Sequence, residues 1–274
     1  HGAVRQTDLT AVQTPPLTRQ MIAPAYFSQL NDKIEFDTIF SDLLKRRFLD
    51  LRKTDAAGLR EFCAGTDAIF CKPAGLCGGE GIQRLVTADI DDYDALYDRL
   101  VKGGQLLIEE PIRQHPDMNR LCPDSVNTVR IVTLVMEQGA QMVYALVRMG
   151  MGGVCVDNVS SGGMYAPVNE HGQLYRPAFC DKTGKYYERH PVTGTEITGF
   201  QIPLFDQALE LCRTASKRVE AHLKYIGWDV AITPDGPVLV EGNNLPGYDM
   251  CQNAGHVDEG MLPRFEKLLG RPIM

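Results

Sequence analysis

The amino-acid sequence predicts an α+β protein. Two hairpins of apolar strands are expected at 127–149 and 227–241, the second with its turn at 234–236. Helical spacing of apolar residues occurs at 91–101 and 203–225. These helices do not alternate with single strands in repeated βα units. A doubly wound sheet is therefore excluded, and hairpins mixed with helices indicate an α+β fold.

Composition limits the class of protein further. The chain has 274 residues, of which 44% are hydrophobic and 23% charged, so it can bury a large core shared by two or three lobes. Its formal net charge of −7 argues against a nucleic-acid-binding protein, because phosphate neutralisation requires a basic surface. Any anionic ligand must instead be held by local lysines and arginines.

The lack of long apolar runs and of paired cysteine motifs predicts a cytoplasmic protein with reduced thiols. No run approaches the roughly 20 residues that span a bilayer, and the N-terminus lacks the apolar segment of a signal peptide. None of the eight cysteines forms a CxxC pair, and no His and Cys cluster has the spacing of zinc ligands. His1-Gly2 resembles the remnant of a cleaved tag, so we expect the natural start to be missing.

The first half of the chain is expected to combine short strands with helices. Residues 1–25 are polar and predict an arm, and residues 34–51 have apolar side chains at helical spacing. Three basic residues, Lys45–Arg47, interrupt that spacing and are expected in solvent. A helix at 91–101 ends at two glycines. The remaining segments are strands at 67–72, 82–86 and 106–110, and a loop at 111–124.

The second half is expected to continue with strands. Gly150–Gly163 is glycine-rich and predicts a mobile loop, and residues 164–190 predict short strands with turns. The helix at 203–225 begins with a proline, which suits the first helical turn. A short helix at 258–269 is the last predicted element.

A lysine and a glycine-rich turn form the first candidate site. Lys72 ends a predicted strand, and four glycines follow within seven residues, at 75, 78, 79 and 81. Such turns let backbone N–H groups approach phosphate oxygens, and the lysine adds a cationic charge. The pattern fits neither a Walker loop nor a dinucleotide-binding GxGxxG turn. An ordinary hairpin turn is the alternative.

Two acids at the end of an apolar strand form the second candidate site. Glu109 and Glu110 follow Leu106–Ile108 directly. Such a strand can present a carboxylate and backbone groups to an adenine edge or a ribose. The alternative is a strand that simply leaves the core.

The third candidate site is the hairpin that contains Asp229, Glu241 and Asn243. Residues 241 and 243 share a face because side chains alternate along a strand, and residue 229 can reach that face across the hairpin. Three hard oxygen ligands would then converge, as a Mg²⁺ site on nucleotide phosphates requires. The alternative is a set of solvated strand ends.

Polar residues near the central strands form the fourth candidate site. Arg130 and Arg148 interrupt apolar strands, and Asn158 lies in the glycine-rich loop after them. A charged side chain on a buried strand needs an anionic partner. That partner is either a ligand or a structural acid.

Taken in this order, the motifs resemble the ATP-grasp superfamily of carboxylate ligases, and most closely the sugar-transfer-associated ATP-grasp family. The resemblance spans residues 31–247, and its last segment is the most specific. The matching segments are NDKI at 31–34, FCKPAGLCGGEGI at 70–82, LLIEEPI at 106–112, SVNTVRIVT at 125–133, DNVSSGG at 157–163, HPVTGTEITGFQIP at 190–203 and GWDVAITPDGPVLVEGNNLPG at 227–247.

The resemblance implies the ATP-grasp fold, in which two α+β lobes grip ATP between them. Residues 31–112 would form the smaller lobe, with the glycine-rich loop and the adenine hinge. Residues 113–274 would form the larger lobe, with the metal site. Residues 1–30 would be an arm or the remnant of a truncated lobe.

The resemblance also implies roles for individual residues. The groups expected to bind ATP are Lys33, Lys72, Gly78, Gly79 and Gly81 at the phosphates, Glu109 and Glu110 at adenine, and His115 or Asp117 at the ribose. Mg²⁺, with Mn²⁺ as the alternative metal, would bind Asp229, Glu241 and Asn243. Arg148 would contact the transferred phosphate. Arg130 and Asn158 are predicted to be catalytic together with Arg148.

The implied activity is that of an ADP-forming carboxylate–amine ligase, linked to cell-surface polysaccharide or natural-product biosynthesis. A small-molecule carboxylate would attack the γ-phosphate of ATP, and an amine would capture the acyl phosphate to give an amide. Two alternatives stay open. One is an ATP-grasp kinase that phosphorylates a small molecule, and the other is a nucleotide-binding regulator without turnover.

This chain departs from the ATP-grasp pattern in two places. Many such ligases carry an arginine just before the first metal acid, where this chain has Gly227-Trp228, and Arg130 is the candidate replacement. The segment before Lys33 is also shorter than the usual N-terminal substrate lobe. Either that lobe is missing from this sequence, or residues 150–200 hold the substrate.

Overall fold

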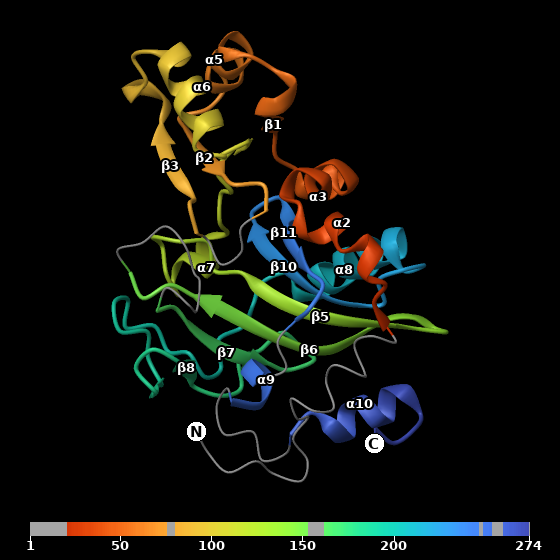
Figure 1. Cartoon of the computed structure of the whole chain (residues 1–274). Coiled ribbons are helices and arrows are strands. Elements are labelled where there is room, and N and C mark those ends of the chain that lie inside the picture. The colour runs from red at the N-terminus through yellow and green to blue at the C-terminus, as the bar shows by residue number, and fades with distance from the viewer. Residues whose placement is uncertain (1–20, 76–79, 153–161, 247–248, 254–259, 274) are drawn as a thin grey trace. The chain divides into compact units, whose positions relative to one another are not determined.

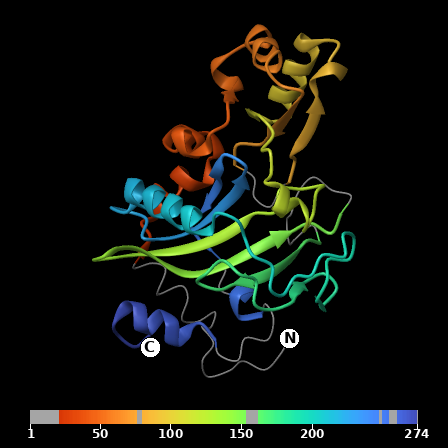
Figure 2. The same ribbon diagram turned by 180° about the vertical axis from the view of Figure 1, so that it is seen from behind.

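The computed structural model describes residues 21–75, 80–152, 162–246, 249–253 and 260–273. The chain divides into two compact units, drawn in Figure 1 and from behind in Figure 2. Ser28–Arg113 form the small unit, and Gln114–Met274 with the chain up to Phe27 form the large unit. Each unit combines helices with an antiparallel sheet, which confirms the α+β class. The lobe boundaries given above stay a prediction.

The small unit is built on a four-stranded antiparallel sheet in the order β1-β4-β2-β3. Its strands are β1 (Phe48–Asp50), β2 (Ala68–Lys72), β3 (Gln83–Val86) and β4 (Leu107–Glu109). Two helices, α5 (Ala56–Cys63) and α6 (Tyr93–Lys102), share an apolar core with the sheet. The members of that core are Leu51, Leu59, Phe62, Cys63, Ile69, Cys71, Leu96, Leu100 and Ile108.

Side-chain caps explain where the helices of the small unit begin. Asp55 caps α5 and Asp92 caps α6, each by accepting a hydrogen bond from a backbone N–H in the first turn. Asp32 does the same for α3 (Lys33–Ile39). The other short elements here are α2 (Ser28–Asn31), α4 (Ser41–Leu44), η2 (Leu51–Lys53) and η3 (Thr87–Asp89).

The predicted helix over 34–51 is wrong in its second half. Helix α4 ends at Leu44, and Lys45 has a left-handed backbone with φ of 49°. Phe48 then starts strand β1. The apolar residues at 48–51 also fit helical spacing, but here they belong to β1, the edge strand of the four-stranded sheet, and to the turn that follows it.

The large unit is built on a seven-stranded antiparallel sheet in the order β11-β10-β5-β6-β7-β8-β9. Its strands are β5 (Val129–Met136), β6 (Gly139–Met149), β7 (Met164–Val168), β8 (Ala178–Cys180), β9 (Lys185–Tyr187), β10 (Tyr225–Thr233) and β11 (Gly236–Asn243). The two central hairpins predicted from the sequence are therefore confirmed. The long strands β5, β6, β10 and β11 position the polar residues described below.

Helices cover both faces of this sheet. Helix α8 (Phe205–Val219) packs on β5, β6, β10 and β11, and Ser216 of α8 lies 3.2 Å from the Thr133 hydroxyl. Trp228 donates to the same hydroxyl, so it points to the α8 face. On the opposite face, Phe265 of α10 (Leu262–Leu269) packs edge-on against Tyr225. The remaining elements are η1 (Pro24–Tyr26), α7 (Pro116–Asn119) and α9 (Asp249–Asn253).

Several predicted boundaries need correction in the large unit. Helix α8 ends at Val219, short of the predicted 225, because Tyr225 already belongs to β10. The predicted loop at 111–124 contains the short helix α7. The predicted mobile loop, Gly150–Gly163, lies mostly outside the described residues.

No helix in the described part of the chain is both long and apolar enough to cross a membrane. No disulfide joins the cysteines of the described residues, namely Cys63, Cys71, Cys122, Cys180, Cys212 and Cys251. Cys77 and Cys155 lie outside the described residues.

Candidate functional site

The predicted metal residues meet on one face of the β10–β11 hairpin. Asp229 stands directly opposite Glu241, and Asn243 stands opposite Gly227. Asn243 Nδ2 lies 3.3 Å from the Gly227 carbonyl oxygen and 3.4 Å from Asp229 Oδ2. The expectation that residues 229, 241 and 243 share a face is confirmed for the positions of their side chains.

Two arginines bind the Asp229 carboxylate. Arg130 is its cross-strand neighbour on β5 and donates from both Nε and Nη2, the latter at 2.8 Å. Arg148 on β6 donates from Nη2 to Asp229 Oδ2, also at 2.8 Å. Burial alone would raise the pKa of Asp229, but Arg130 and Arg148 hold it well below its usual range. The carboxylate is therefore ionised and fully paired inside the sheet.

The glycine at 227 creates the space that Arg130 fills. A Cβ atom at Gly227 would lie 3.2 Å from Arg130 Cδ and 2.8 Å from Pro246 Cβ. A larger side chain at 227 would thus displace the arginine. This arrangement explains why an arginine on β5 stands beside Asp229 while the position before Trp228 is glycine.

Glu241 is the half-buried acid of the site, and it is more accessible than Asp229. Its side chain is 35% exposed, and its Oε1 lies 4.0 Å from Arg130 Nη2. Partial burial and the Asp229 carboxylate raise the pKa of Glu241 to about 7, against the opposing charges of Arg148 and Arg130. Contact with water weakens the burial effect on such a side chain. Two carboxylates this close favour binding of either a proton or a cation.

The donor set fits a hard divalent cation through Glu241 and Asn243. Asn243 directs Nδ2 toward Asp229 and Gly227, which leaves its Oδ1 as the acceptor for a ligand. Asp229 is held by its two arginines, so a cation would have to replace one of those contacts. Within the described residues, no group of three or more His, Cys, Asp or Glu could hold a metal ion. A metal here therefore depends on the amide oxygen.

A second polar cluster lies in the small unit around Glu109. Its carboxylate forms ion pairs with Lys72 Nζ and with Arg46, whose Nε donates to Glu109 Oε1 at 2.7 Å. Asp37 lies 3.9 Å from Arg46 Nη2. The Glu109, Asp37 and Arg46 side chains are at most 5% exposed, and Lys72 is 15% exposed. Lys72 is thus the member that reaches the surface.

The pKa values of the two acids in this cluster are shifted in opposite directions. Burial raises the pKa of Asp37 to about 8, and the nearby Glu109 charge adds to that rise. Burial acts on Glu109 in the same direction, but Arg46 and Lys72 lower its pKa to about 2. Asp37 Oδ2 is buried without a hydrogen-bond partner in the described part of the chain, which suits a neutral carboxyl. With Asp37 neutral, two cations face one anion, and the cluster carries a net positive charge.

This cluster changes two interpretations made from the sequence. Arg46, expected in solvent, has a side chain only 5% exposed because it binds Glu109. Glu109, expected at adenine, uses its carboxylate on Lys72 and Arg46. Glu110 pairs with Arg47, accepting from Arg47 Nε at 2.7 Å and from its backbone N–H at 2.9 Å. Recognition of adenine by this segment stays a prediction, and the carboxylate of Glu109 is a poor candidate for it.

The other predicted ATP-binding residues are placed as follows. The backbone N–H of Lys33 donates to the Ala74 carbonyl at 2.9 Å, so the start of α3 lies beside the chain that follows Lys72. Gly81 has φ of 73°, and its carbonyl accepts from Gln105 Nε2. Gly78, Gly79 and Asn158 lie outside the described residues.

His115 and Asp117 have a local structural role. His115 caps α7, because its Nδ1 accepts from the Asp117 backbone N–H at 3.1 Å. The backbone N–H of His115 donates to the Ile232 carbonyl of β10. Binding of a ribose by either residue stays a prediction.

The comparison with known families decides the identity of the fold. A family model described as "Sugar-transfer associated ATP-grasp" matches residues 16–268. The chain belongs to this family. No curated protein matches the sequence.

Solved structures agree with this ATP-grasp assignment at the level of the fold. The ATP-grasp ligase PsnB, complexed with minimal precursor, Mg and ADP, is 17% identical with a TM-score of 0.52, over 90% of this chain and 60% of PsnB. The D-alanyl-alanine synthetase A from Vibrio cholerae O1 biovar eltor is 14% identical with a TM-score of 0.51, over 92% of this chain and 64% of the synthetase. The ATP-grasp chain described here therefore spans less than two thirds of either neighbour.

Three residues of these clusters were missed by the sequence reasoning. Asp37 and Arg46 complete the Glu109 cluster, and Thr128 Oγ1 accepts from Arg148 Nε at 3.0 Å and from Nη2 at 2.9 Å. Asp37 and Arg46 each interrupt an apolar pattern, the same signal that identified Arg130 and Arg148. Thr128 carries no such signal, since a threonine suits any strand.

Proposed function

We propose that this ATP-grasp chain is an ADP-forming, Mg²⁺-dependent carboxylate–amine ligase. One observation carries the proposal: Asp229 and Glu241 stand opposite each other with Asn243 beside them, and Arg130 and Arg148 adjoin them. Membership of the family supports this proposal, as does the fold similarity to a ligase whose structure contains Mg and ADP.

Each unit contains cations that would bind the nucleotide phosphates. In the small unit, Lys72 is the exposed member of a positively charged cluster, and Lys33 lies near the same segment. Glu109 would hold the Lys72 ammonium until a phosphate oxygen competes for it. In the large unit, Arg148 would share its guanidinium between Asp229 and the transferred phosphate.

Mg²⁺ would be held by Glu241 and Asn243, and by Asp229 where the ion replaces an arginine contact. When bound, the ion would neutralise charge on the β- and γ-phosphates. The chain's own residues do the remaining work. Arg130 keeps Asp229 ionised in a buried setting, and Thr128 fixes the direction of Arg148.

The proposed reaction has two steps. A carboxylate oxygen of the substrate attacks the γ-phosphorus of ATP, and ADP leaves. An amine then attacks the acyl carbon, and inorganic phosphate and one proton leave as the amide forms. Arg148 and Lys72 stabilise the charge that moves during phosphoryl transfer, and no protein nucleophile is required.

A label experiment tests this function. The protein is incubated with Mg·ATP and a panel of carboxylates labelled with heavy oxygen, with and without amines. A ligase releases ADP only with a cognate pair and transfers one labelled oxygen to inorganic phosphate. A stable phosphorylated product without an amine would identify a kinase instead, and no ADP release with any pair would contradict turnover on these substrates.

A matched pair of variants connects the result to the site. Glu241→Gln keeps the size of the side chain and removes its charge, so turnover should fall on the order of 10³-fold or more. Glu210→Gln makes the same change on α8, where the side chain is 62% exposed. It should leave turnover unchanged.

A further inference from the structure

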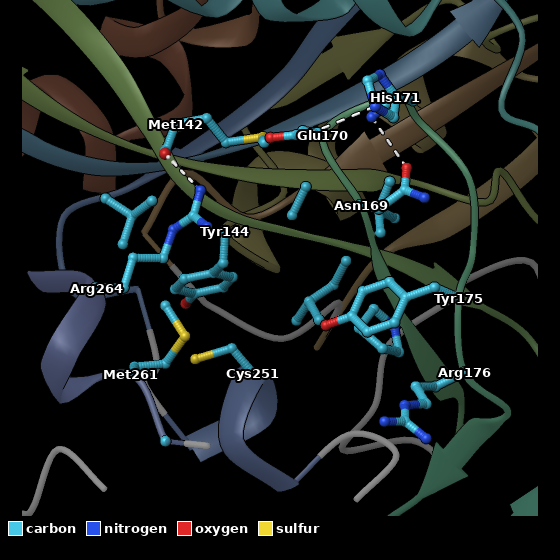
Figure 3. A pocket seen from close by; sticks show the side chains of 16 residues that line it. Met142, Tyr144, Asn169, Glu170, His171, Tyr175, Arg176, Cys251, Met261 and Arg264 are labelled. Carbon is cyan, nitrogen blue, oxygen red and sulfur yellow. Dashed lines mark hydrogen bonds and ion pairs between the residues drawn. The ribbon is translucent and has the colours of Figure 1, made fainter. Parts of the chain in front are cut away.

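A pocket of about 630 Å³ over strands β6 and β7 has Arg176 and Arg264 on opposite sides (Figure 3). Arg264 donates to the Met142 carbonyl at 3.3 Å, so its guanidinium is directed to the wall. In the Glu109 cluster of the small unit, by contrast, two cations meet at one buried carboxylate. A change in one of those two contacts must therefore affect the other.

Strand pairing places these two cations on either side of Glu109. Glu109 is in β4, which lies between β1 and β2 and pairs Glu109 with Phe48 and Phe70. Lys72 is two residues beyond Phe70 in β2, so its side chain shares a face with Glu109. Arg46 is two residues before Phe48 and reaches Glu109 from the β1 side.

The two cations hold different oxygens of the Glu109 carboxylate. Arg46 donates from both Nε and Nη2 to Oε1, and the Nε bond is 2.7 Å long. Lys72 Nζ forms its ion pair with Oε2. Because the two contacts do not share an acceptor atom, Lys72 can leave Oε2 without breaking either bond from Arg46.

Burial makes the contact from Arg46 important when Lys72 leaves. Glu109 is only 2% exposed, so water cannot replace a lost partner, and an unpaired charge in such a setting is strongly unfavourable. Arg46 and Lys72 together lower the pKa of Glu109 to about 2 against the effect of burial. With Arg46 in place, the carboxylate stays paired while the 15% exposed Lys72 binds elsewhere.

Asp37 is a weak competitor for the same guanidinium. Its Oδ1 lies 3.9 Å from Arg46 Nη2, which is beyond hydrogen-bond distance. Burial raises the pKa of Asp37 to about 8, so the carboxyl is mainly neutral at pH 7. The charge of Arg46 is therefore directed to Glu109.

We infer that Arg46 is a positioning residue for ATP binding, because it holds Glu109 and so allows Lys72 to exchange this carboxylate for a phosphate oxygen. Arg46 acts through Glu109 and Lys72, not on the nucleotide itself. In a protein without Arg46, Lys72 would be the cation that remains on the buried carboxylate, and it would stay there. This inference rests on the role proposed above for Lys72 at the phosphates, and it adds the residue that controls the release of Lys72.

Calorimetric titration with Mg·ATP tests the inference. Arg46→Gln should weaken Mg·ATP binding at least about tenfold, because a phosphate must then remove the remaining cation from a buried carboxylate. Arg46→Gln combined with Glu109→Gln also removes the carboxylate that holds Lys72. Its affinity should return to within about threefold of that of the unsubstituted protein. A role that is only structural would give no such recovery.

Arg52→Gln is the matched control. Arg52 is also in the small unit and binds a buried acid, since it donates to both oxygens of Asp50 at 2.8 and 3.0 Å. Asp50 is 8% exposed. The loss of this ion pair should lower stability and leave the affinity for Mg·ATP unchanged. Urea unfolding of every variant shows which samples are folded before titration.

Three results would overturn the inference. They are unchanged affinity in Arg46→Gln, an equal loss in Arg52→Gln, and a loss that the added Glu109→Gln does not reverse. If Arg46→Gln does not fold, Glu109→Gln alone decides. Lys72 is then no longer held, so Mg·ATP should bind at least as tightly as to the unsubstituted protein, and a loss of about tenfold or more would overturn the inference.

Failure of this inference can be distinguished from failure of the proposed function. Turnover in the label experiment, together with unchanged Mg·ATP affinity in Arg46→Gln, would leave the ligase function in place and overturn the role of Arg46. The expected pattern of affinities without turnover of any pair would do the reverse. No Mg·ATP binding by the unsubstituted protein would overturn the role of Arg46 together with that of Lys72.

Discussion

Replacement of Asp37 by asparagine should change how the stability of the protein depends on pH. The folded protein raises the Asp37 pKa from an ordinary 3.8 to about 8, so the folded state keeps a proton that the unfolded state releases above about pH 4. Stability from this group is therefore fully present below that pH. It is lost as pH rises toward about 8, and stays constant above it.

The size of the effect follows from a single proton. One proton changes the free energy of unfolding by about 1.4 kcal/mol per pH unit. The asparagine that replaces Asp37 is close to it in size and has no proton to lose across this pH range. From about pH 5.5 to about pH 7.5, the stability of Asp37→Asn relative to the unsubstituted protein should therefore rise by about 2.7 kcal/mol.

Urea unfolding followed by circular dichroism at several pH values measures this difference. The two proteins share every other titratable group. The difference between their free energies of unfolding therefore isolates the pH dependence that comes from Asp37. Asp98→Asn, an exposed position on α6, is the matched control and should give a difference that does not vary with pH. An Asp37→Asn difference that is constant across the range would show that Asp37 is ionised, and the net positive charge assigned to the Lys72 cluster would then be wrong.

Two further predictions concern the two polar clusters. Gly227→Ala should destabilise the large unit by about 1–3 kcal/mol, because its Cβ would stand 2.8 Å from Pro246 Cβ, and it should also weaken Mg·ATP binding by displacing Arg130. Urea unfolding and calorimetry measure the two effects, and a variant with the stability and affinity of the unsubstituted protein would contradict the packing argument. Lys72→Ala should weaken ATP binding more than Lys102→Ala does. Lys102 is the control because its side chain is exposed at the end of α6. Equal affinities by calorimetry would remove Lys72 from the phosphate site.

Local patterns were sufficient to predict the hairpin that carries the metal candidates, but not its full register. The turn sets the pairing from Thr233 and Gly236 to Val230 and Leu239, and a β-bulge between Asp229 and Val230 then shifts the register by one residue and places Asp229 opposite Glu241. The same reasoning identified Arg130 and Arg148 as charged groups that need an anion. It could not say that the anion is Asp229 itself, because the β5–β10 pairing joins positions 99 residues apart.

Non-local contacts explain what the sequence could not reveal in the small unit. Arg46 and Glu109 are 63 residues apart and meet because β1 pairs with β4. The helical spacing over 34–51 concealed that strand, since its apolar residues satisfy both a helix and a sheet edge. An acid at the end of an apolar strand was therefore assigned to adenine, when its carboxylate binds the candidate phosphate lysine.

Thermal unfolding with and without Mg·ATP tests the central claim, that Glu241 and its neighbours form a metal-dependent nucleotide site. At about 100 times the Kd, Mg·ATP should stabilise the unsubstituted protein by about 2.7 kcal/mol. Omission of Mg²⁺ or replacement of Glu241 by glutamine should abolish most of that gain, while Glu210→Gln should retain it. No stabilisation of the unsubstituted protein, or the same stabilisation in Glu241→Gln, would contradict the account.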